Sequence, residues 1–376
     1  MSSRLRLGPA ATERRPIPIG NTPLHPGGSS RQGRAPKPPT IREVARHAGV
    51  SLGTVSRVLH SHASVGEDVR ERVLRAVREL DYHPDFVARS MRTGATHTVG
   101  CIITDISNPL FADIIQAAER ELRLAGYSMI VANSMGDPDE ELSLVRALLA
   151  RRVDGLILAS PERSLEETRE LLRTAGIPIV LLDREMDVAG DQVLTDHEAG
   201  LVEATEYLLA LGHTRIGLVC GPVGVRPGYT RLRGFRSAMQ RAGLDPEPFI
   251  RTGSFSPQEG LRLAIDLLKS PQRPSALIAG SNQLLEGVLR ATRTLGLEIP
   301  GDLSLIGCDD TPLSELSLPP ITVVARNIPE IGRSATRLFL DRRAASATDA
   351  DRPRVLTLGT SLVIRQSCMA FRTPGA

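Results

Sequence analysis

The segment VSLGTVSRVLH at residues 50–60 combines two kinds of helix face. Its apolar positions recur at helical spacing and are Val50, Val55, Val58 and Leu59. Between them stand short hydroxyl side chains, which suit phosphate oxygens: Ser51, Thr54 and Ser56. Arg57 is long enough to reach a guanine edge with two hydrogen bonds. These residue types at this spacing indicate a helix that contacts nucleic acid.

Two residues without polar side chains lie at the N-terminal end of that helix. Leu52 could contact a thymine methyl group. Gly53 permits close approach of the helix to DNA but has no side chain that could distinguish one base from another. The alternative is that the hydroxyls only cap the helix or face solvent and that Arg57 pairs with a nearby acid. Composition alone leaves both interpretations open.

A second set of polar residues follows apolar runs further along the chain and comprises Asp105, Asn108, Asn133, Asp183, Ser281, Asn282, Asp309 and Asp310. Ligands of open parallel sheets bind outside the carboxyl ends of the strands, so these residues should line one cleft. With Arg231 and the ring of Phe255, such carboxylates suit a polyhydroxylated molecule. The alternative is that strand-end Asp and Asn cap helices, that Arg231 pairs with an acid and that Asp310 is a cap or hinge residue.

Three short helices are expected around the 50–60 segment. The first should bury Ile41, Val44 and Ala45. Gly49 supplies the turn after it, and Ser51 caps the second helix. A third helix, over about 68–80, should bury Val69, Val73, Leu74 and Val77. Two short helices joined by a glycine turn and braced by a third make a helix-turn-helix head.

From residue 98 onward, apolar runs of strand length alternate with helical patterns, as in VGCIITD followed by PLFADIIQAAERELRLAG. Repeated strand and helix units build parallel sheets covered by helices. The series runs to IPIVLLD and starts again at HEAGLVEATEYLLALGH, so the core should have two lobes. Near its C-terminal end, the chain should cross between the lobes again. The segments involved are TVVARN, a helix near 328–342 and the strands of RVLTLGTSLVIRQS.

Composition excludes several classes of protein. The four cysteines are far apart without a CxxC pair, so neither a disulfide framework nor a zinc site is expected. No run approaches about 18 consecutive apolar residues, and no secretion signal precedes the helices. The sequence also lacks a GxSxG elbow, a GxxxxGK[ST] loop and an HExxH pair. We therefore expect a cytoplasmic protein that is not an enzyme and uses no membrane, cofactor or metal.

Residues 1–39 are rich in Pro, Gly, Arg and Ser and contain seven basic residues against one acid. Without hydrophobic periodicity, this segment is predicted to be disordered. It is either a basic arm that adds weak, non-specific affinity for nucleic acid or a dispensable tail.

TIREVARHAGVSLGTVSRVLH resembles the headpiece of the lactose repressor and galactose repressor family of bacterial transcription regulators. LDYHPDFVARSMRTGATHTVGCIITDISNPLF resembles that family's hinge and the start of its core, and the likeness extends from about residue 40 to about 368. It implies an N-terminal all-α helix-turn-helix headpiece and an α/β core of two periplasmic-binding-protein-like lobes. It also implies a homodimeric repressor that binds a pseudo-palindromic double-stranded DNA operator and is switched by a small polar effector, such as a sugar.

The resemblance assigns roles to individual residues. Positions that hold the phosphate backbone are Thr40, Ser51, Thr54 and Ser56, and those that read bases are Leu52, Gly53 and Arg57, with His60 also near the DNA. In a hinge helix over 85–91, Ala88 lets two helices cross closely, and Met91 stands where relatives carry a leucine that wedges into the minor groove. The alternative for Met91 is packing beneath the core. Effector positions are Asp183, Arg231, Phe255, Ser281 and Asp309, although relatives commonly have asparagine where Ser281 stands.

The expected domains are a disordered extension at 1–39, the headpiece at 40–84, a hinge helix and linker at 85–96, and the core at 97–370. Within the core, the N-lobe should comprise about 97–195 plus 322–352 and the C-lobe about 196–321 plus 353–370. A solute-binding protein or a sugar-acting enzyme of the same core fold is the alternative. The solute-binding protein would need a signal peptide and no headpiece.

Overall fold

The structure is a computed structural model that describes residues 39–59, 65–82, 94–160, 164–345 and 352–371. Three residues expected at the DNA, His60, Ala88 and Met91, lie outside the described residues, as do 1–38 of the predicted extension. The chain forms two compact units, Met1–Pro84 and Asp85–Ala376. Their boundary coincides with the expected end of the headpiece.

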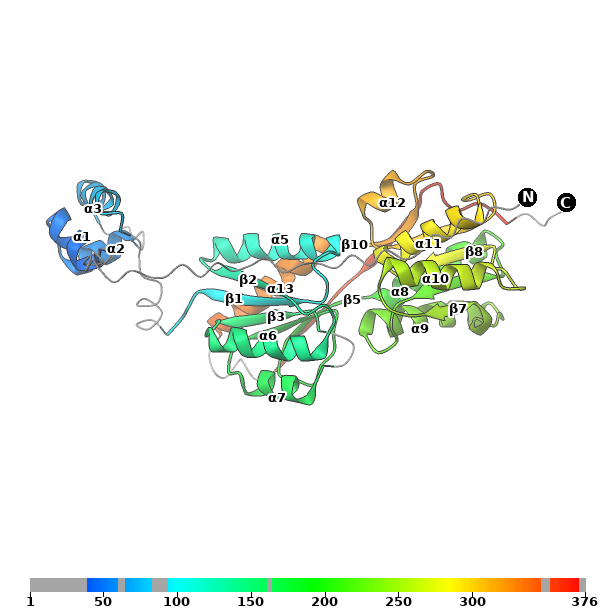
Figure 1. The fold of residues 1–376 in the computed structure, drawn as a ribbon, viewed down its shortest axis with the longest axis horizontal. Helices are drawn as coiled ribbons and strands as arrows, with labels where there is room; N and C mark the ends of the chain where they lie inside the picture. The colour runs from blue at the N-terminus through cyan, green and yellow to red at the C-terminus, as the bar shows by residue number, and fades with distance from the viewer. Residues whose placement is uncertain (1–38, 60–64, 83–93, 161–163, 346–351, 372–376) are drawn as a thin grey trace, which may run out of the picture. The chain divides into compact units, whose positions relative to one another are not determined.

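The first unit contains three helices, α1 (Ile41–Ala48), α2 (Leu52–Leu59) and α3 (Glu67–Glu79) (Figure 1). Thr40 precedes α1, and its hydroxyl donates to the Glu43 carboxylate over 3.0 Å. Gly49 ends α1 with a φ of 64°, a left-handed conformation that glycine adopts without steric cost. Ser51 caps α2 by accepting a hydrogen bond from the Thr54 amide over 3.2 Å. The helix-turn-helix prediction is therefore confirmed in its elements and in its turn.

The core of this unit is small and aliphatic. Val44, Val55, Val58 and Val73 are almost completely buried. Leu74, which was expected inside, is 37% exposed, and Ala76 is buried in its place. The inward face of α3 passes through Val73 and Ala76, three residues apart, so the adjacent Leu74 is turned away from α1 and α2.

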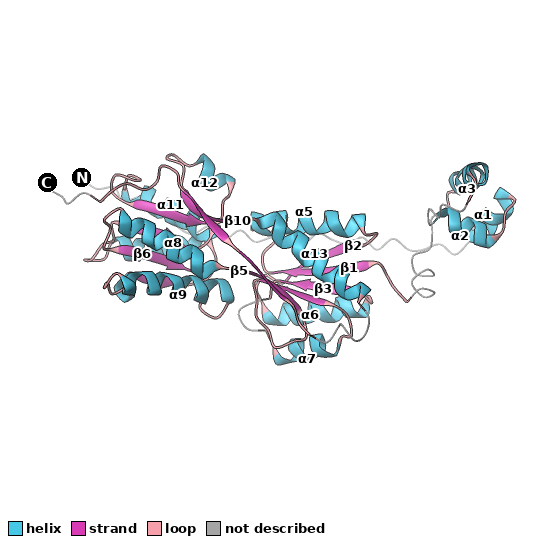
Figure 2. Cartoon of the chain, turned by 180° about the vertical axis from the view of Figure 1, so that it is seen from behind, coloured by secondary structure: helices cyan, strands magenta, loops and turns pink. Residues whose placement is uncertain are grey.

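In the described part of the second unit, two six-stranded sheets form the two lobes (Figures 1 and 2). The N-lobe sheet has the order β11-β5-β4-β3-β1-β2 and contains β1 (Thr98–Ile103), β2 (Ser128–Asn133), β3 (Gly155–Leu158), β4 (Ile179–Leu182), β5 (Asp191–Thr195) and β11 (Val355–Leu358). The C-lobe sheet has the order β12-β10-β9-β8-β6-β7 and contains β6 (Ile216–Cys220), β7 (Ile250–Thr252), β8 (Ala276–Ala279), β9 (Ser304–Cys308), β10 (Thr322–Arg326) and β12 (Thr360–Val363). All pairings are parallel except the antiparallel one between β10 and β12.

Helices cover both faces of each sheet, which explains why the strands are apolar throughout. In the N-lobe, α5 (Pro109–Leu124) and α13 (Ile328–Ala344) pack on one face, and α6 (Pro138–Ala150) and α7 (Glu166–Thr174) on the other. In the C-lobe, the pairs are α8 (His197–Ala210) with α9 (Arg226–Arg241) and α10 (Pro257–Leu268) with α11 (Asn282–Leu295). Two shorter helices, η1 (Glu247–Phe249) and α12 (Pro312–Leu316), complete the C-lobe.

The chain crosses between the described sheets after β5, after β10 and after β11. The expected lobe boundaries at 321/322 and 352/353 are therefore wrong by one strand each. Thr322–Arg326 pairs with β9 and β12 in the C-lobe, and Val355–Leu358 pairs with β5 in the N-lobe. Both strands are short, and their sequences carry no information about which of the two sheets their backbones will join.

None of the described helices is long and apolar enough to cross a membrane. The four cysteines are free thiols, and three of them are buried. No group of three or more His, Cys, Asp or Glu side chains in the described ranges is arranged to hold a metal ion.

Candidate functional site

A cavity of about 500 Å³ lies between the two lobes of the core. Its walls come from the carboxyl ends of β1, β4, β8, β9 and β10 and from the first turns of α5, α9 and α11. This is the position that the topology of parallel sheets favours for a ligand. Because both sheets contribute, an occupant of the cavity would contact both lobes.

All five residues expected at an effector line this cavity: Asp183, Arg231, Phe255, Ser281 and Asp309. Asp105, Asn108 and Asn282, which the strand-end pattern also singled out, line it as well. Asn133 and Asp310 are not among the described residues that line it. The Asn133 side chain accepts a hydrogen bond from the Ile106 amide. Asp310 pairs with Arg365 over 2.8 Å, and the N-cap of α12 is the next residue, Thr311.

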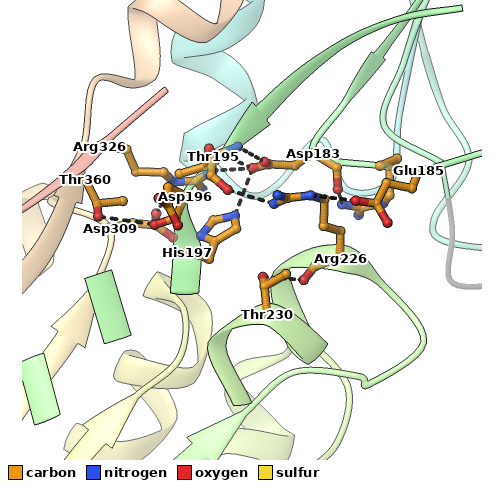
Figure 3. A network of polar contacts seen from close by, with 11 residues as sticks. Asp183, Glu185, Thr195, Asp196, His197, Arg226, Thr230, Asp309, Arg326 and Thr360 are labelled. Carbon is orange, nitrogen blue, oxygen red and sulfur yellow. Dashed lines mark hydrogen bonds and ion pairs between the residues drawn. The ribbon is translucent and has the colours of Figure 1, made fainter. Parts of the chain in front are cut away.

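Asp183, directly after β4, is the centre of a network of polar contacts (Figure 3). Its Oδ1 accepts from the Thr195 amide over 2.7 Å, and its Oδ2 accepts from Arg326 Nη1 over 2.6 Å. Burial alone raises the pKa of this carboxyl, but His197, Arg326 and the Thr195 amide more than offset burial and hold the pKa well below its usual range. Asp183 is therefore an ionised, hydrogen-bonded carboxylate.

His197 begins α8 and lies 3.2 Å from Asp183 through its Nε2. Burial and, secondarily, the charge of Arg231 lower the pKa of His197 to about 4. The ring is therefore neutral near pH 7. Because the ionised Asp183 can only accept, the Nε2 atom must carry the proton of the imidazole ring.

Arg326, the last residue of β10, joins the two lobes through their carboxylates. Its Nη1 donates to Asp183 in the N-lobe, and its Nε donates to Asp309 in the C-lobe over 2.7 Å. Burial opposes ionisation of Asp309, but the Arg326 and Arg231 charges lower its pKa. Sequence analysis missed Arg326, although it stands at the carboxyl end of a strand like the residues that were found.

Arg231 and Arg184 supply the other guanidinium groups of the cavity wall. Arg231, on α9, is only 3% exposed, and its Nε makes no hydrogen bond to any described residue. Arg184, which sequence analysis also missed, donates from Nε to the Ser160 carbonyl oxygen over 2.6 Å and from Nη1 to the Asp183 carbonyl oxygen over 2.9 Å. Its burial lowers its pKa to about 10, so it stays charged at neutral pH.

Phe255 and Ser281 occupy the C-lobe wall. The Phe255 ring lies so close to Gly221 that a Cβ there would stand 2.0 Å from the ring, so only glycine allows this approach. Ser281 caps α11 by accepting from the Leu284 amide over 3.1 Å. The capping interpretation of Ser281 therefore holds, and the residue also lines the cavity.

Two further sets of contacts link the lobes at the rim. On one side, Gln283 donates to Asp105 over 2.8 Å and Asn282 donates to Asn108 over 2.9 Å. On the other, Arg226 donates to Glu185 over 3.1 Å and to the Thr195 carbonyl oxygen over 2.7 Å (Figure 3). The lobes are thus held together around the cavity by polar contacts, which an occupant could reinforce or replace.

The headpiece presents a separate polar surface on α2. Leu52 is 44% exposed, and Gly53 and Arg57 are also exposed, whereas Val55 and Val58 face inward. Arg57 Nε donates to the Gly53 carbonyl oxygen over 3.2 Å, so the side chain lies along the helix. The Ser51 and Thr54 hydroxyls lie 2.9 Å apart at the N-terminus of α2, and Ser56 is partly buried.

Comparison with known proteins links both units to one family. Residues 40–85 match the family model described as bacterial regulatory proteins, lacI family, and residues 205–368 match the periplasmic binding protein-like domain. The chain is 35% identical to the ribose operon repressor of Escherichia coli (strain K12) over 305 residues, which cover 81% of this chain and 92% of that protein.

Solved structures agree with this relationship. A lac repressor dimer bound to operator and the anti-inducer ONPF is 28% identical, with 89% of this chain and 100% of that chain covered at a TM-score of 0.78. A complex of the transcriptional regulator CelR with cellobiose is 31% identical, with 88% and 99% covered at a TM-score of 0.67. These relatives are transcription regulators and not enzymes, and they confirm the headpiece and two-lobed core that the sequence implied. The chain therefore belongs to the lacI family of bacterial regulatory proteins.

Proposed function

We propose that this protein is a cytoplasmic repressor that binds a pseudo-palindromic operator as a homodimer. A small polar effector in the cavity between the lobes, a sugar or sugar derivative, sets its affinity for DNA. The observation that carries this proposal is the position of the cavity between the lobes, with Arg326, at one of the segments where the chain crosses between them, in its wall. A ligand at this position can favour one arrangement of the lobes over another.

The surface of α2 supports the DNA-binding role. The hydroxyls of Ser51 and Thr54 gather at a helix N-terminus, which suits a phosphate of the backbone. Thr40 and Ser56 are proposed to hold phosphates as well. Leu52, Gly53 and Arg57 are exposed together and would meet base edges in the major groove. His60, Ala88 and Met91 remain predictions from the sequence.

Exposed leucines near α12 support the dimer. Leu316 is 77% exposed and Leu318 is 96% exposed, with Leu313 nearby on the same helix. Such a group of apolar side chains favours contact with a second copy of the chain. A two-fold dimer would place two recognition helices about 10 base pairs apart on the operator.

The chemistry of the cavity supports a polar effector. Hydrogen-bonding side chains alternate with apolar ones such as Phe111 and Phe255, an arrangement suited to a molecule with polar edges and an apolar face. The cellobiose held by the related CelR protein points to the same class of molecule.

The proposed switch is a shift between lobe arrangements. The crossing segments at 195–197 and 326–328 carry Thr195, His197 and Arg326, which contact the acids of the cavity wall. An effector that binds one arrangement more tightly would shift the population towards it and change how two hinges approach each other on DNA. Effector binding would either release the operator or strengthen its binding, according to which lobe arrangement the effector prefers.

Selection of bound duplexes from a random DNA pool by the purified full-length protein, at a fixed salt concentration, tests this function. We expect enrichment of an inverted repeat, and insertion of about five base pairs between its half-sites should abolish tight binding because it rotates one half-site to the opposite face of the duplex. A folded protein that enriches no sequence would contradict the proposal. Enrichment that tolerates the half-turn insertion would contradict the dimer geometry.

A further inference from the structure

One carboxyl group of the N-lobe is completely buried. Glu141 lies in the first half of α6 and has an exposed fraction of 0%. Neither of its carboxyl oxygens is in hydrogen-bonding geometry with a donor of the described residues. The other buried residues of α6 are the apolar Leu142, Val145 and Leu148. Because ionisation in such surroundings costs free energy, a carboxyl group placed here favours its neutral form.

Buried hydroxyl groups lie beside this carboxyl group. They belong to Ser160, which follows β3, and to Ser164, which precedes α7. Seven buried side-chain polar atoms make no hydrogen bond in the described part of the chain. Five of them are oxygens of Glu141, Ser160, Ser164 and Thr168, the last of which lies on α7. A protonated Glu141 adds an O–H donor to this group of oxygens, which its ionised form cannot do.

Arg184 connects this buried group to the cavity between the lobes. Its side chain lines the cavity, and its charge acts on Glu141. Its Nε donates to the Ser160 carbonyl oxygen over 2.6 Å, and its Nη1 donates to the Asp183 carbonyl oxygen over 2.9 Å. Ser160 thus contacts Arg184 through its backbone and lies beside Glu141 through its side chain. These contacts form a continuous path from the buried carboxyl group to the cavity wall.

The other charged groups on the surrounding elements lie at the surface or have partners there. On α6 itself, Asp137 and Asp139 are exposed and Glu140 is half-buried. The acids of α7 and of the segment after β4 pair with arginines of α6, α7 and α9, and these acids are Glu166, Glu167, Glu170, Glu185 and Asp187. The charge that responds most directly to Glu141 is therefore that of Arg184.

We propose that Glu141 is a proton-binding residue that positions Arg184 in the wall of the cavity. When Glu141 is neutral, the two carbonyl oxygens hold Arg184 at the wall. When Glu141 loses its proton, the carboxylate attracts the guanidinium group towards the interior of the N-lobe. The charge presented to an effector then depends on pH. This effect on the effector rests on the proposed function, whereas the proton site and its coupling to Arg184 do not.

The proton on Glu141 should make stability depend on pH. Burial raises the pKa of Glu141 above its ordinary value of 4.5, although the Ser164 and Ser160 hydroxyls and the charge of Arg184 act in the opposite direction. The folded protein therefore keeps a proton that the unfolded chain releases. This contribution to stability is lost as pH rises from 4.5 towards the pKa of the folded protein. The sign is opposite to that for His197, whose burial lowers its pKa.

Glu141→Gln keeps the shape of the side chain and cannot ionise. Denaturant unfolding of this variant and of the unmodified full-length protein, between about pH 5 and about pH 8, gives the ratio of their folding equilibrium constants. We expect the ratio to rise by up to about tenfold per pH unit and to level off above the pKa of Glu141. The ratio cancels the titration of His197, which both proteins share. Glu141→Met, which cannot ionise either, replaces the glutamine variant if that variant does not fold.

Glu166→Gln is the matched control on the neighbouring helix. The Glu166 side chain is 65% exposed, and hydrogen bonds from Arg169 and Arg173 lower its pKa. Its ratio to the unmodified protein should therefore stay constant over the same pH range. Arg184→Gln tests the coupling. Removal of the guanidinium should raise the pKa of Glu141, so the effect of Glu141→Gln in this background should level off at a higher pH.

Nitrogen-15 NMR of the arginine side chains tests the positioning of Arg184 directly. The Nε–H resonance of Arg184 is assigned by its loss in Arg184→Lys. We expect this resonance to shift with pH at the midpoint that the unfolding ratio gives for Glu141. It should stay constant in Glu141→Gln, where the carboxylate that attracts the guanidinium is absent.

Three results would overturn the inference: a ratio for Glu141→Gln that does not change with pH, the same levelling pH with and without Arg184, or an Nε–H resonance that does not respond to Glu141. None of these measurements requires DNA or an effector. A failed operator selection would therefore reject the proposed function without affecting them. A selected operator together with a ratio that does not change with pH would reject this inference alone.

Discussion

Asp183 and Asp309 follow strands of different lobes and bind the same guanidinium. Arg326 donates to Asp183 from Nη1 over 2.6 Å and to Asp309 from Nε over 2.7 Å. Both acids also adopt left-handed backbone conformations, with φ values of 48° and 69°, which are uncommon for residues other than glycine. The two lobes thus present equivalent carboxylates to one arginine at the segment where β10 passes into α13.

Arg326→Gln should lower the free energy of unfolding by about 3 kcal/mol, because it leaves two buried carboxylates without their cation. Denaturant unfolding measures this loss. The double variant Arg326→Gln with Asp309→Asn should recover part of it, since one of those charges is removed. Arg262→Gln, at an exposed pair with Glu259, is the control and should cost less than about 1 kcal/mol. Equal losses of unfolding free energy in Arg326→Gln and Arg262→Gln would contradict the stabilising role of Arg326 between the two carboxylates.

His197 should make stability depend on pH. Its pKa is lowered to about 4 in the folded protein from an ordinary value of 6.5, so the unfolded chain binds the proton more tightly. The resulting stabilisation is fully present above pH 6.5 and is lost as pH falls towards 4. Denaturant unfolding at a series of pH values should show this decline.

His197→Gln removes the titrating ring and retains an N–H donor for Asp183. Its free energy of unfolding should fall less steeply between pH 6.5 and 4, by up to about 1.4 kcal/mol per pH unit. Some slope should remain, because burial also lowers the pKa of His213. Identical slopes in the variant and the unmodified protein would mean that His197 is not a buried neutral histidine.

Arg57→Ala should reduce discrimination at one base position of the selected operator by about 1 to 3 kcal/mol. Binding to the operator and to its single-base variants, compared by fluorescence anisotropy, measures this effect. Arg75→Ala is a control at another exposed arginine of the headpiece. If Arg57→Ala instead weakens binding equally on every sequence, Arg57 holds a phosphate and does not read a base.

Leu316→Glu should disrupt the dimer, because it places a charge among the exposed leucines near α12. Sedimentation equilibrium should give a monomer, and affinity for the two-half-site operator should fall about 100-fold or more. Leu74→Glu, at an exposed leucine of α3, should remain dimeric. A Leu316→Glu variant that stays dimeric would place the dimer contact elsewhere.

Local patterns predicted the elements well because the interactions that form them are local. The spacing of Val55 and Val58 and the turn glycine Gly49 were sufficient for the headpiece. The alternation of strands and helices was sufficient for two parallel lobes. The strand-end rule then placed Asp183 and Asp309 at one cavity, since it depends only on chain direction within a parallel sheet.

Sequence analysis was wrong or silent where contacts are distant along the chain. Strand β10 was assigned to the wrong lobe because its partners, β9 and β12, are chosen by backbone pairing across the sheet. Arg326 was missed since a single arginine in TVVARN gives no sign that it will pair with Asp183, 143 residues away in sequence. The same pairing means that the two acids are less available to an effector than their residue types suggest.

Control of DNA binding by the cavity is tested by the effect of cellular small molecules on operator affinity. Affinity for the selected operator is measured with and without the small-molecule extract of cells that produce the protein. We expect at least about a tenfold change for the unmodified protein. We expect no change for a folded Asp309→Asn variant that binds the operator normally. An equal response in both proteins, or a response in neither, would contradict control of DNA binding by the cavity.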